Sequence, residues 1–69
     1  MTEYLIVVEK ANGNFSAYCP DLPGFIATGT TREETEANMR EAVRMHLDGL
    51  RAGGQPLPEP SATASRIAV

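Results

Sequence analysis

The sequence predicts a single α+β domain, in which a β-β-β-α-β chain forms one sheet with one helix packed on one face. Short apolar runs separated by turn residues fill residues 1–29, and an amphipathic stripe with helical spacing fills residues 30–53. A connector rich in proline and small residues, 54–65, then leads to a short apolar run at 66–69. With 69 residues, the chain has room for one domain of this kind.

The first strand is predicted in EYLIVVEK, residues 3–10. Its middle is apolar on both faces, which is typical of a central strand. Asn12-Gly13 follows and is a strong signal for a tight hairpin, because both residues tolerate positive φ angles. FSAYC, residues 15–19, is therefore predicted as the second strand.

The third strand is predicted in FIATG, residues 25–29, after a corner in the chain. Pro20 and Pro23 have no amide hydrogen to donate, so neither can continue a central ladder. Gly24 can adopt the positive φ that a turn after Pro23 requires. We therefore interpret this proline-rich loop as a corner between strands.

The helix is predicted in TTREETEANMREAVRMHLDGLRAGG. Thr30 and Thr31 each begin a capping box, with Glu33 and Glu34 as the acidic members. With helical spacing, the apolar side chains form one stripe, which consists of Thr35, Met39, Ala42, Val43, His46 and Leu50. This stripe predicts that the helix covers one face of the sheet.

The order of the elements predicts where the last strand lies. The first and third strands of a meander run the same way, and a right-handed crossover returns residues 66–69 to the outer side of the first strand. The predicted sheet order is therefore 3-2-1-4, with the last strand parallel to the first. On the face without the helix, Leu5 and Val7 still need cover. Cys19 and His46 are single residues of their kinds, which argues against a disulfide or a structural zinc, so we expect a dimer or tetramer.

The charge balance indicates a class of partner. Six basic and nine acidic residues give a net charge of -3, which leaves no electrostatic footprint for nucleic acid and suits a basic protein partner. The longest apolar run is too short to span a membrane, and the start of the chain lacks a positively charged leader. We therefore expect a soluble, cytoplasmic protein without direct contact to nucleic acid or membrane.

Two side chains carry chemistry that an active site could use. His46 lies on the apolar stripe with no residue placed to orient it, so a core-edge histidine is favoured over a general base. Cys19 shares a strand face with Phe15 and Ala17, so a small core residue is favoured over a nucleophile. We expect no catalytic residue, metal or cofactor, and therefore a binding module.

Acidic side chains are the candidate contacts for a partner. Asp21 is either a ligand or a turn former that bonds nearby backbone, and the turn former is favoured. The acidic residues of the predicted helix fit a partner-binding patch and a solvated face equally well. The candidate set is Asp21, Glu33, Glu34, Glu36 and Glu41.

The order of these features resembles the HicB-like antitoxin domain from about Tyr4 to Pro58. The resemblance rests on EYLIVVEK with its hairpin, on PDLPG before a short strand, on the GTTREE entry to a single helix and on GQPLP after it. It implies a partial ribonuclease-H-like fold and a domain that masks a small basic RNA-cleaving toxin, commonly as a dimer or larger assembly. The clustered carboxylates of that enzyme fold are absent, so the resemblance does not imply nuclease activity.

Many members of that family continue into a helix-turn-helix or ribbon-helix-helix segment that binds DNA. SATASRIAV, at the end of this sequence, does not supply one. The leading hypothesis is therefore a non-enzymatic, self-associating antitoxin-type domain that neutralises a HicA-type toxin. The alternative is a solitary homo-oligomer without a toxin partner that binds a small ligand or has a regulatory role. A pocket at the subunit junction near Tyr18, Cys19 and His46 would favour this alternative, and a degenerate nuclease ranks last.

Overall fold

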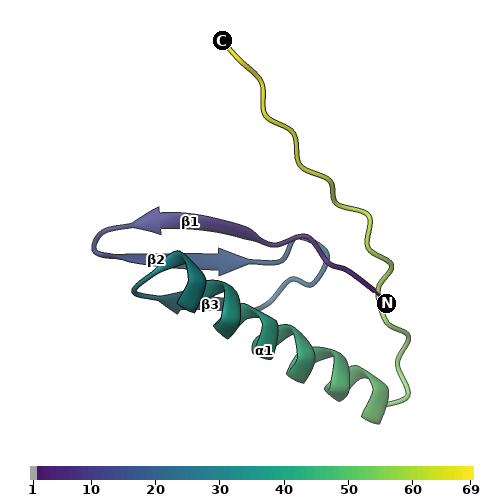
Figure 1. Cartoon of the computed structure of the whole chain (residues 1–69). Helices are drawn as coiled ribbons and strands as arrows, with labels where there is room; N and C mark the ends of the chain where they lie inside the picture. Colours follow the sequence, from purple (N-terminus) through teal and green to yellow (C-terminus); the bar gives the residue numbers. More distant parts are fainter. Residues whose placement is uncertain (1) are drawn as a thin grey trace.

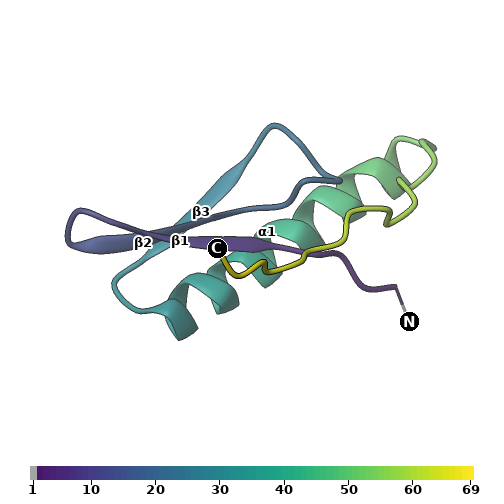
Figure 2. The ribbon, with the colours of Figure 1, turned by 90° about the horizontal axis from the view of Figure 1, so that it is seen from above.

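The fold is known from a computed structural model, which describes residues 2–69. Three strands, β1 (Val7–Ala11), β2 (Asn14–Tyr18) and β3 (Ile26–Gly29), precede one helix, α1 (Arg32–Ala52). The strands form an antiparallel sheet in the order β1-β2-β3, and α1 lies across one face of it, obliquely to the strands (Figures 1 and 2). The α+β class predicted from the sequence is confirmed.

The register of the strands separates the side chains into two faces. Val8, Ala17 and Ala27 form a row across the sheet on the side of α1. The neighbouring row, Val7, Tyr18 and Ile26, points to the opposite side, which we call the open face. The sheet therefore carries apolar side chains on both faces and a helix on one.

The core lies between the sheet and the buried stripe of α1. Ala17, Leu22 and Met39 have no exposed surface, and Cys19 is almost completely buried. The stripe is as predicted, since Thr35 and Met39 are buried and its other members are half-buried. At the β3 edge of the sheet, the Asn38 amide nitrogen donates to the Thr28 carbonyl (2.8 Å) and so closes part of that edge.

The turns use the predicted glycines. Gly13 closes the two-residue hairpin between β1 and β2 with a φ of 76°, and Gly24 follows Pro23 with a φ of 105°. Asn12 does not take a positive φ, because glycines are the only residues in the described chain that do. The corner at PDLPG also buries Leu22, whose N–H donates to the Cys19 carbonyl (3.1 Å).

The helix begins at the second of the two predicted boxes, the one of Thr31 and Glu34, and no capping contact of Glu33 with Thr30 is found among residues 2–69. Thr31 is the N-cap, and its Oγ1 accepts from the Glu34 N–H (3.0 Å). The Glu34 carboxylate accepts from the N–H of Thr30 (2.8 Å), one residue earlier than in a standard capping box. The helical residues are therefore 32–52, within the predicted 30–53, because the threonines stand outside the helix as caps.

Two expectations about the first strand are wrong. It begins at Val7 instead of residue 3, because β2 ends at Tyr18, opposite Val7, and the proline corner leaves residues 3–6 without a partner strand. It also lies at an edge of the sheet, although its apolar pattern predicts a central position. Much of the apolar run that predicts a central strand lies before β1, and within β1 only Val7 and Val8 are large apolar residues, one on each face.

The predicted last strand does not form in the described chain. Residues 66–69 are extended and exposed, and the sheet has three strands. A run of four residues offers few ladder bonds to offset the entropy of ordering it. Figure 1 shows this end of the chain, in yellow, rising away from the helix and the sheet.

Candidate functional site

Asp21 anchors the C-terminal segment of the chain. Its carboxylate accepts three hydrogen bonds, from the Ser61 N–H (3.1 Å), the Ser61 hydroxyl (3.0 Å) and the Ala62 N–H (3.1 Å). The Ala62 N–H is the main cause that holds the pKa of Asp21 below its usual 3.8; desolvation opposes it, and the two Ser61 donors lower the pKa further. The sequence suggests a ligand or a turn former at Asp21 but does not reveal this anchor. The reason is that the donors lie about forty residues away in the chain.

A second contact fixes the same segment. The Tyr4 hydroxyl donates to the Pro58 carbonyl (2.6 Å). The connector after α1 is therefore held at Pro58 and again at residues 61 and 62. We call the part beyond, residues 63–69, the C-terminal arm. The arm is exposed throughout, and no hydrogen bond of the described chain reaches it.

The four candidate glutamates do not form one patch. Glu34 and Glu41 are seven residues apart and share one side of α1, while Glu33 and Glu36 lie nearer the side that faces β1. Three of them already have partners: Glu34 caps the helix, Glu36 pairs with Arg32 (3.3 Å) and Glu41 lies 3.9 Å from Arg44. Asp21 lies in the β2–β3 corner, at the opposite end of β3 from the start of α1.

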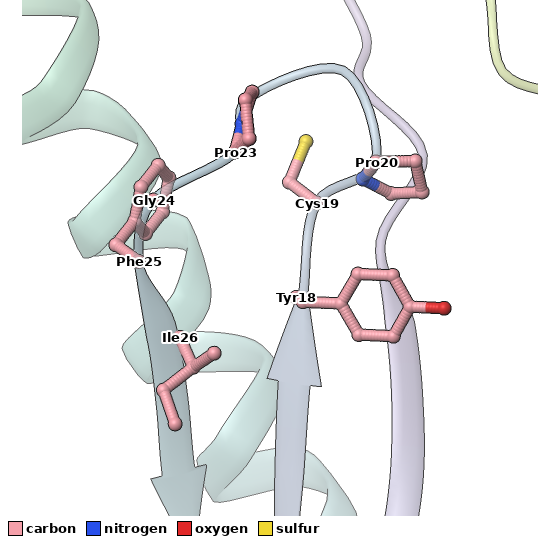
Figure 3. Close-up of a pocket in the computed structure, with 7 residues that line it drawn as sticks. All are labelled: Tyr18, Cys19, Pro20, Pro23, Gly24, Phe25 and Ile26. Carbon is pink, nitrogen blue, oxygen red and sulfur yellow. The ribbon is translucent and has the colours of Figure 1, made fainter.

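A shallow pocket lies at the corner between β2 and β3 (Figure 3). It has a volume of about 520 Å³, and Figure 3 shows Tyr18 and Ile26 at the strand ends, with the Tyr18 ring extended toward β1. Cys19 lines the pocket as well. His46 does not line it, although its ring lies against that of Phe25, a lining residue, at a centroid distance of 4.9 Å. The structure therefore brings together two of the three residues expected around a small-ligand site.

A larger groove runs between α1 and the chain that leads into β1. We call it the β1–α1 groove; its volume is about 1000 Å³, and one wall is formed by residues 2–6. Met39, Val43 and Leu47 of α1 form its apolar floor. Arginines form its outer rim, namely Arg40, Arg44 and Arg51. The groove exists because α1 packs mainly over β3 and β2 and leaves β1 uncovered on this side.

Sequence reasoning missed this groove for a specific reason. Helical spacing predicts that the arginines lie opposite the apolar stripe, on a solvated side, and that Glu36 pairs with Arg40, four residues later. Instead, Glu36 pairs with Arg32, and Arg40 has no ion-pair partner among the described residues. The signal available in the sequence was the apolar run of β1, which indicates a neighbour that the single chain does not supply.

The described chain therefore defines a small α+β domain whose prominent features are surfaces: an open sheet face, a free sheet edge and an apolar groove. No helix within residues 2–69 has the length and apolar character needed to cross a membrane.

A protein-family model, described as the HicB-like antitoxin of bacterial toxin–antitoxin systems, matches residues 4–68. The chain belongs to this family.

Curated relatives agree with this assignment. A UPF0150 protein of Synechocystis is 37% identical over 57 residues, which cover 81% of this chain and 72% of that protein. A UPF0150 protein of Thermoplasma acidophilum is 28% identical over 61 residues, covering 87% and 88%. A 14.9 kDa protein from the rep-hol intergenic region of Haemophilus phage HP1 is 34% identical over 56 residues, but the match spans only 42% of its length. No solved structure matches the chain.

Proposed function

We propose that this domain is an antitoxin that neutralises a small, basic, RNA-cleaving toxin of the HicA type without catalysis of its own. The observation that carries the proposal is the family match over residues 4–68. The net charge of -3 supports it, because an acidic surface attracts a basic partner and masks its RNA-binding side. The proposed compartment is the cytoplasm, where the RNA substrate of such a toxin lies.

The exposed acidic side chains of α1 are the proposed contacts, with Glu33 and Glu41, which lie on two adjoining sides of the helix, as the leading members. Glu33 has no ion pair among residues 2–69, and the 3.9 Å contact of Glu41 with Arg44 joins two largely exposed side chains. Such surface pairs are weak and exchange easily for a partner's arginine or lysine. Asp21, Glu34 and Glu36 also belong to the proposed set, although their carboxylates already hold contacts within the chain.

Co-expression with the neighbouring reading frame tests the proposal. We expect a tagged chain to co-purify with a small basic protein and to relieve the growth defect that this protein causes. Glu33→Lys with Glu41→Lys should weaken the complex at low salt, while Glu59→Lys, in the exposed connector, should not. A neighbouring frame whose product neither binds the chain nor impairs growth would contradict the antitoxin assignment.

We also propose that the domain self-associates and that its four-stranded, ribonuclease-H-like sheet of order 3-2-1-4 is completed in the assembly. The row of Val7, Tyr18 and Ile26 on the open face supports self-association, since Ile26 is 67% exposed in the single chain, and the free edge of β1 leaves room for a fourth strand. Ile26→Glu should lower the mass measured by light scattering. A monomer mass for the unchanged protein at micromolar concentration would contradict self-association.

The corner pocket favours a second candidate function, a regulatory domain that binds a small ligand. Its volume of about 520 Å³ lies within the range of ligand sites, and Tyr18 offers a hydroxyl at its edge. A thermal-shift screen of small apolar and aromatic compounds tests this. Compounds that stabilise the unchanged protein but not Tyr18→Ala would favour it, and a screen without stabilising compounds would count against it.

A further inference from the structure

We propose that the β1–α1 groove and the free edge of β1 bind the C-terminal arm of a second copy of this chain. Each copy would donate residues 63–69 and accept those of its partner, in a two-fold exchange of arms. The proposal rests on the self-association proposed above and deepens it, since it names the segment that is exchanged and a binding surface different from the open face.

The first argument is that β1 is built for a neighbour that it lacks. Val7 and Val8 make it apolar on both faces, yet it forms an edge of the sheet. The other edge is partly closed, because Asn38 of α1 donates to the Thr28 carbonyl of β3. No hydrogen bond of the described chain closes the outer side of β1 in this way. Exposed strand edges of this kind pair readily with another extended chain.

The second argument is that the arm has the pattern of the missing strand. Ile67 and Val69 alternate with Arg66 and Ala68, so that the two large apolar side chains share one face. Ile67 is 84% exposed, and no other part of its own chain covers it. Seven extended residues reach about 23 Å, close to the roughly 22 Å of helix that borders the groove from Glu36 to Arg51.

The third argument is charge. If Ile67 and Val69 face the groove floor of Met39, Val43 and Leu47, Arg66 faces the open side of the sheet. On that side β1 presents Glu9, which shares the face of Val7. The one charged side chain of the arm therefore lies on the same side as a carboxylate of the strand that it joins.

The donor is a second copy because of how the arm leaves its own chain. The contacts of Asp21 with Ser61 and Ala62 fix the point of departure, and from there the arm projects away from its own body (Figure 1). Its own groove stays open, with a volume of about 1000 Å³. Exchange between copies requires a segment that leaves its own body at a fixed point and a site on the same chain that this segment does not fill. The arm and the β1–α1 groove meet both requirements.

Spin labelling tests the exchange directly. A nitroxide is attached to Ala68→Cys, on the arm face away from the groove, in a chain whose Cys19 is replaced by alanine. The labelled chains are mixed with unlabelled chains enriched in ¹⁵N. We expect the amide signals of β1 and of α1 around Val43 and Leu47 to broaden in the ¹⁵N chains, which carry no label themselves.

Three results would overturn the proposal. Broadening that occurs only within a chain carrying both the label and ¹⁵N would show that the arm folds back on its own groove. Broadening confined to Val7, Tyr18 and Ile26 would place the arm on the open face. No broadening at a concentration where the protein is dimeric would exclude any docking of the arm.

A mass measurement with a matched pair of variants completes the test. Ile67→Asp should reduce the mass at micromolar concentration toward the 7.4 kDa of one chain. Met45→Asp is the control, because Met45 is also a large exposed apolar residue (71%) but lies on the outer side of α1. Both changes affect exposed side chains, so circular dichroism should remain unchanged. Equal effects of the two variants on the mass would contradict a specific role for the arm.

Discussion

At the scale of single residues, Gly29 shows how closely the sheet and the helix approach. A Cβ atom at Gly29 would lie 2.6 Å from the Thr35 hydroxyl oxygen and 2.8 Å from the Thr35 backbone nitrogen. Thr35 is fully buried and its hydroxyl donates to the Thr31 carbonyl (2.7 Å), so it has little freedom to move. A side chain at position 29 would therefore have to push the first turn of α1 away from β3.

Gly29→Ala should lower the free energy of unfolding by about 1–3 kcal/mol, as overpacked core substitutions do. Gly49→Ala is the matched control, because no atom lies within 4 Å of a Cβ atom there and the position is an exposed helix interior. This change should raise the free energy of unfolding by about 1 kcal/mol through helix propensity. Urea unfolding measures both, and a neutral Gly29→Ala would contradict the close contact.

Asp21 gives a prediction about pH. Its pKa is lower in the folded chain than its usual 3.8, so its contacts with Ser61 and Ala62 stabilise the fold above that value and are lost as the pH falls through the folded pKa. NMR titration of the Asp21 carboxyl should give a pKa below 3.8, and the protection of the Ala62 amide relative to its intrinsic exchange rate should fall as the carboxyl is protonated.

Asp21→Asn should accelerate the amide exchange of Ala62 at neutral pH, because the neutral amide is a weaker acceptor. Glu59→Gln is the control in the same connector, since Glu59 forms no ion pair in residues 2–69. Equal exchange rates at Ala62 in Asp21→Asn and in the unchanged protein would show that the anchor does not hold in solution.

At the scale of elements, α1 depends on its cap as much as on its apolar stripe. The Thr31 hydroxyl satisfies the Glu34 N–H, and the Glu34 carboxylate satisfies the Thr30 N–H. The first contact uses a donor that the first turn of a helix leaves unpaired, and the second satisfies the N–H of the residue just before the N-cap. The acidic residues there, Glu33 and Glu34, also complement the positive end of the helix dipole.

Thr31→Ala should lower the free energy of unfolding by about 1 kcal/mol, the usual effect of losing an N-cap side chain. Thr30→Ala should have a smaller effect, because the Thr30 hydroxyl makes only an exposed 3.3 Å contact with Glu34. Thermal unfolding followed by circular dichroism compares the two. A larger loss for Thr30→Ala would place the cap one residue earlier.

At the scale of the whole molecule, the single chain is a small structure with much apolar surface left uncovered. Few of its side chains are fully buried, while Tyr18, Ile26 and Ile67 are exposed on the open face and the arm. A domain of this size buries only about 60% of the surface of its unfolded chain, so association is an effective way to gain stability. The stability of the protein should therefore depend on its concentration.

We expect the unfolding temperature to rise with protein concentration. For a dimer that unfolds to two chains, a tenfold increase in concentration adds about 1.4 kcal/mol per dimer, which corresponds to a shift of about 4 °C. Calorimetry over a hundredfold range of concentration measures the shift. Ile67→Asp should remove most of it, and an unchanged midpoint for the unaltered protein would indicate a stable monomer.

The sequence predicted local structure well where local rules decide it. The Asn12-Gly13 hairpin, the corner with Gly24, the threonine cap and the stripe through Met39 all depend on residues close together in the chain. The start of β1 and the role of Asp21 could not be predicted in this way. Both depend on distant segments, namely where β2 ends and where residues 61 and 62 lie.

The sequence by itself determined the α+β class, the family and the apolar character of β1, because composition, spacing and turn chemistry are local properties. Only the tertiary structure decided that β1 lies at an edge, that α1 leaves a groove beside it and that the arm projects from an anchor at Asp21. These features depend on which segments meet in space. An apolar strand pattern indicates that a neighbour is needed, whereas the fold decides whether the chain itself can supply it.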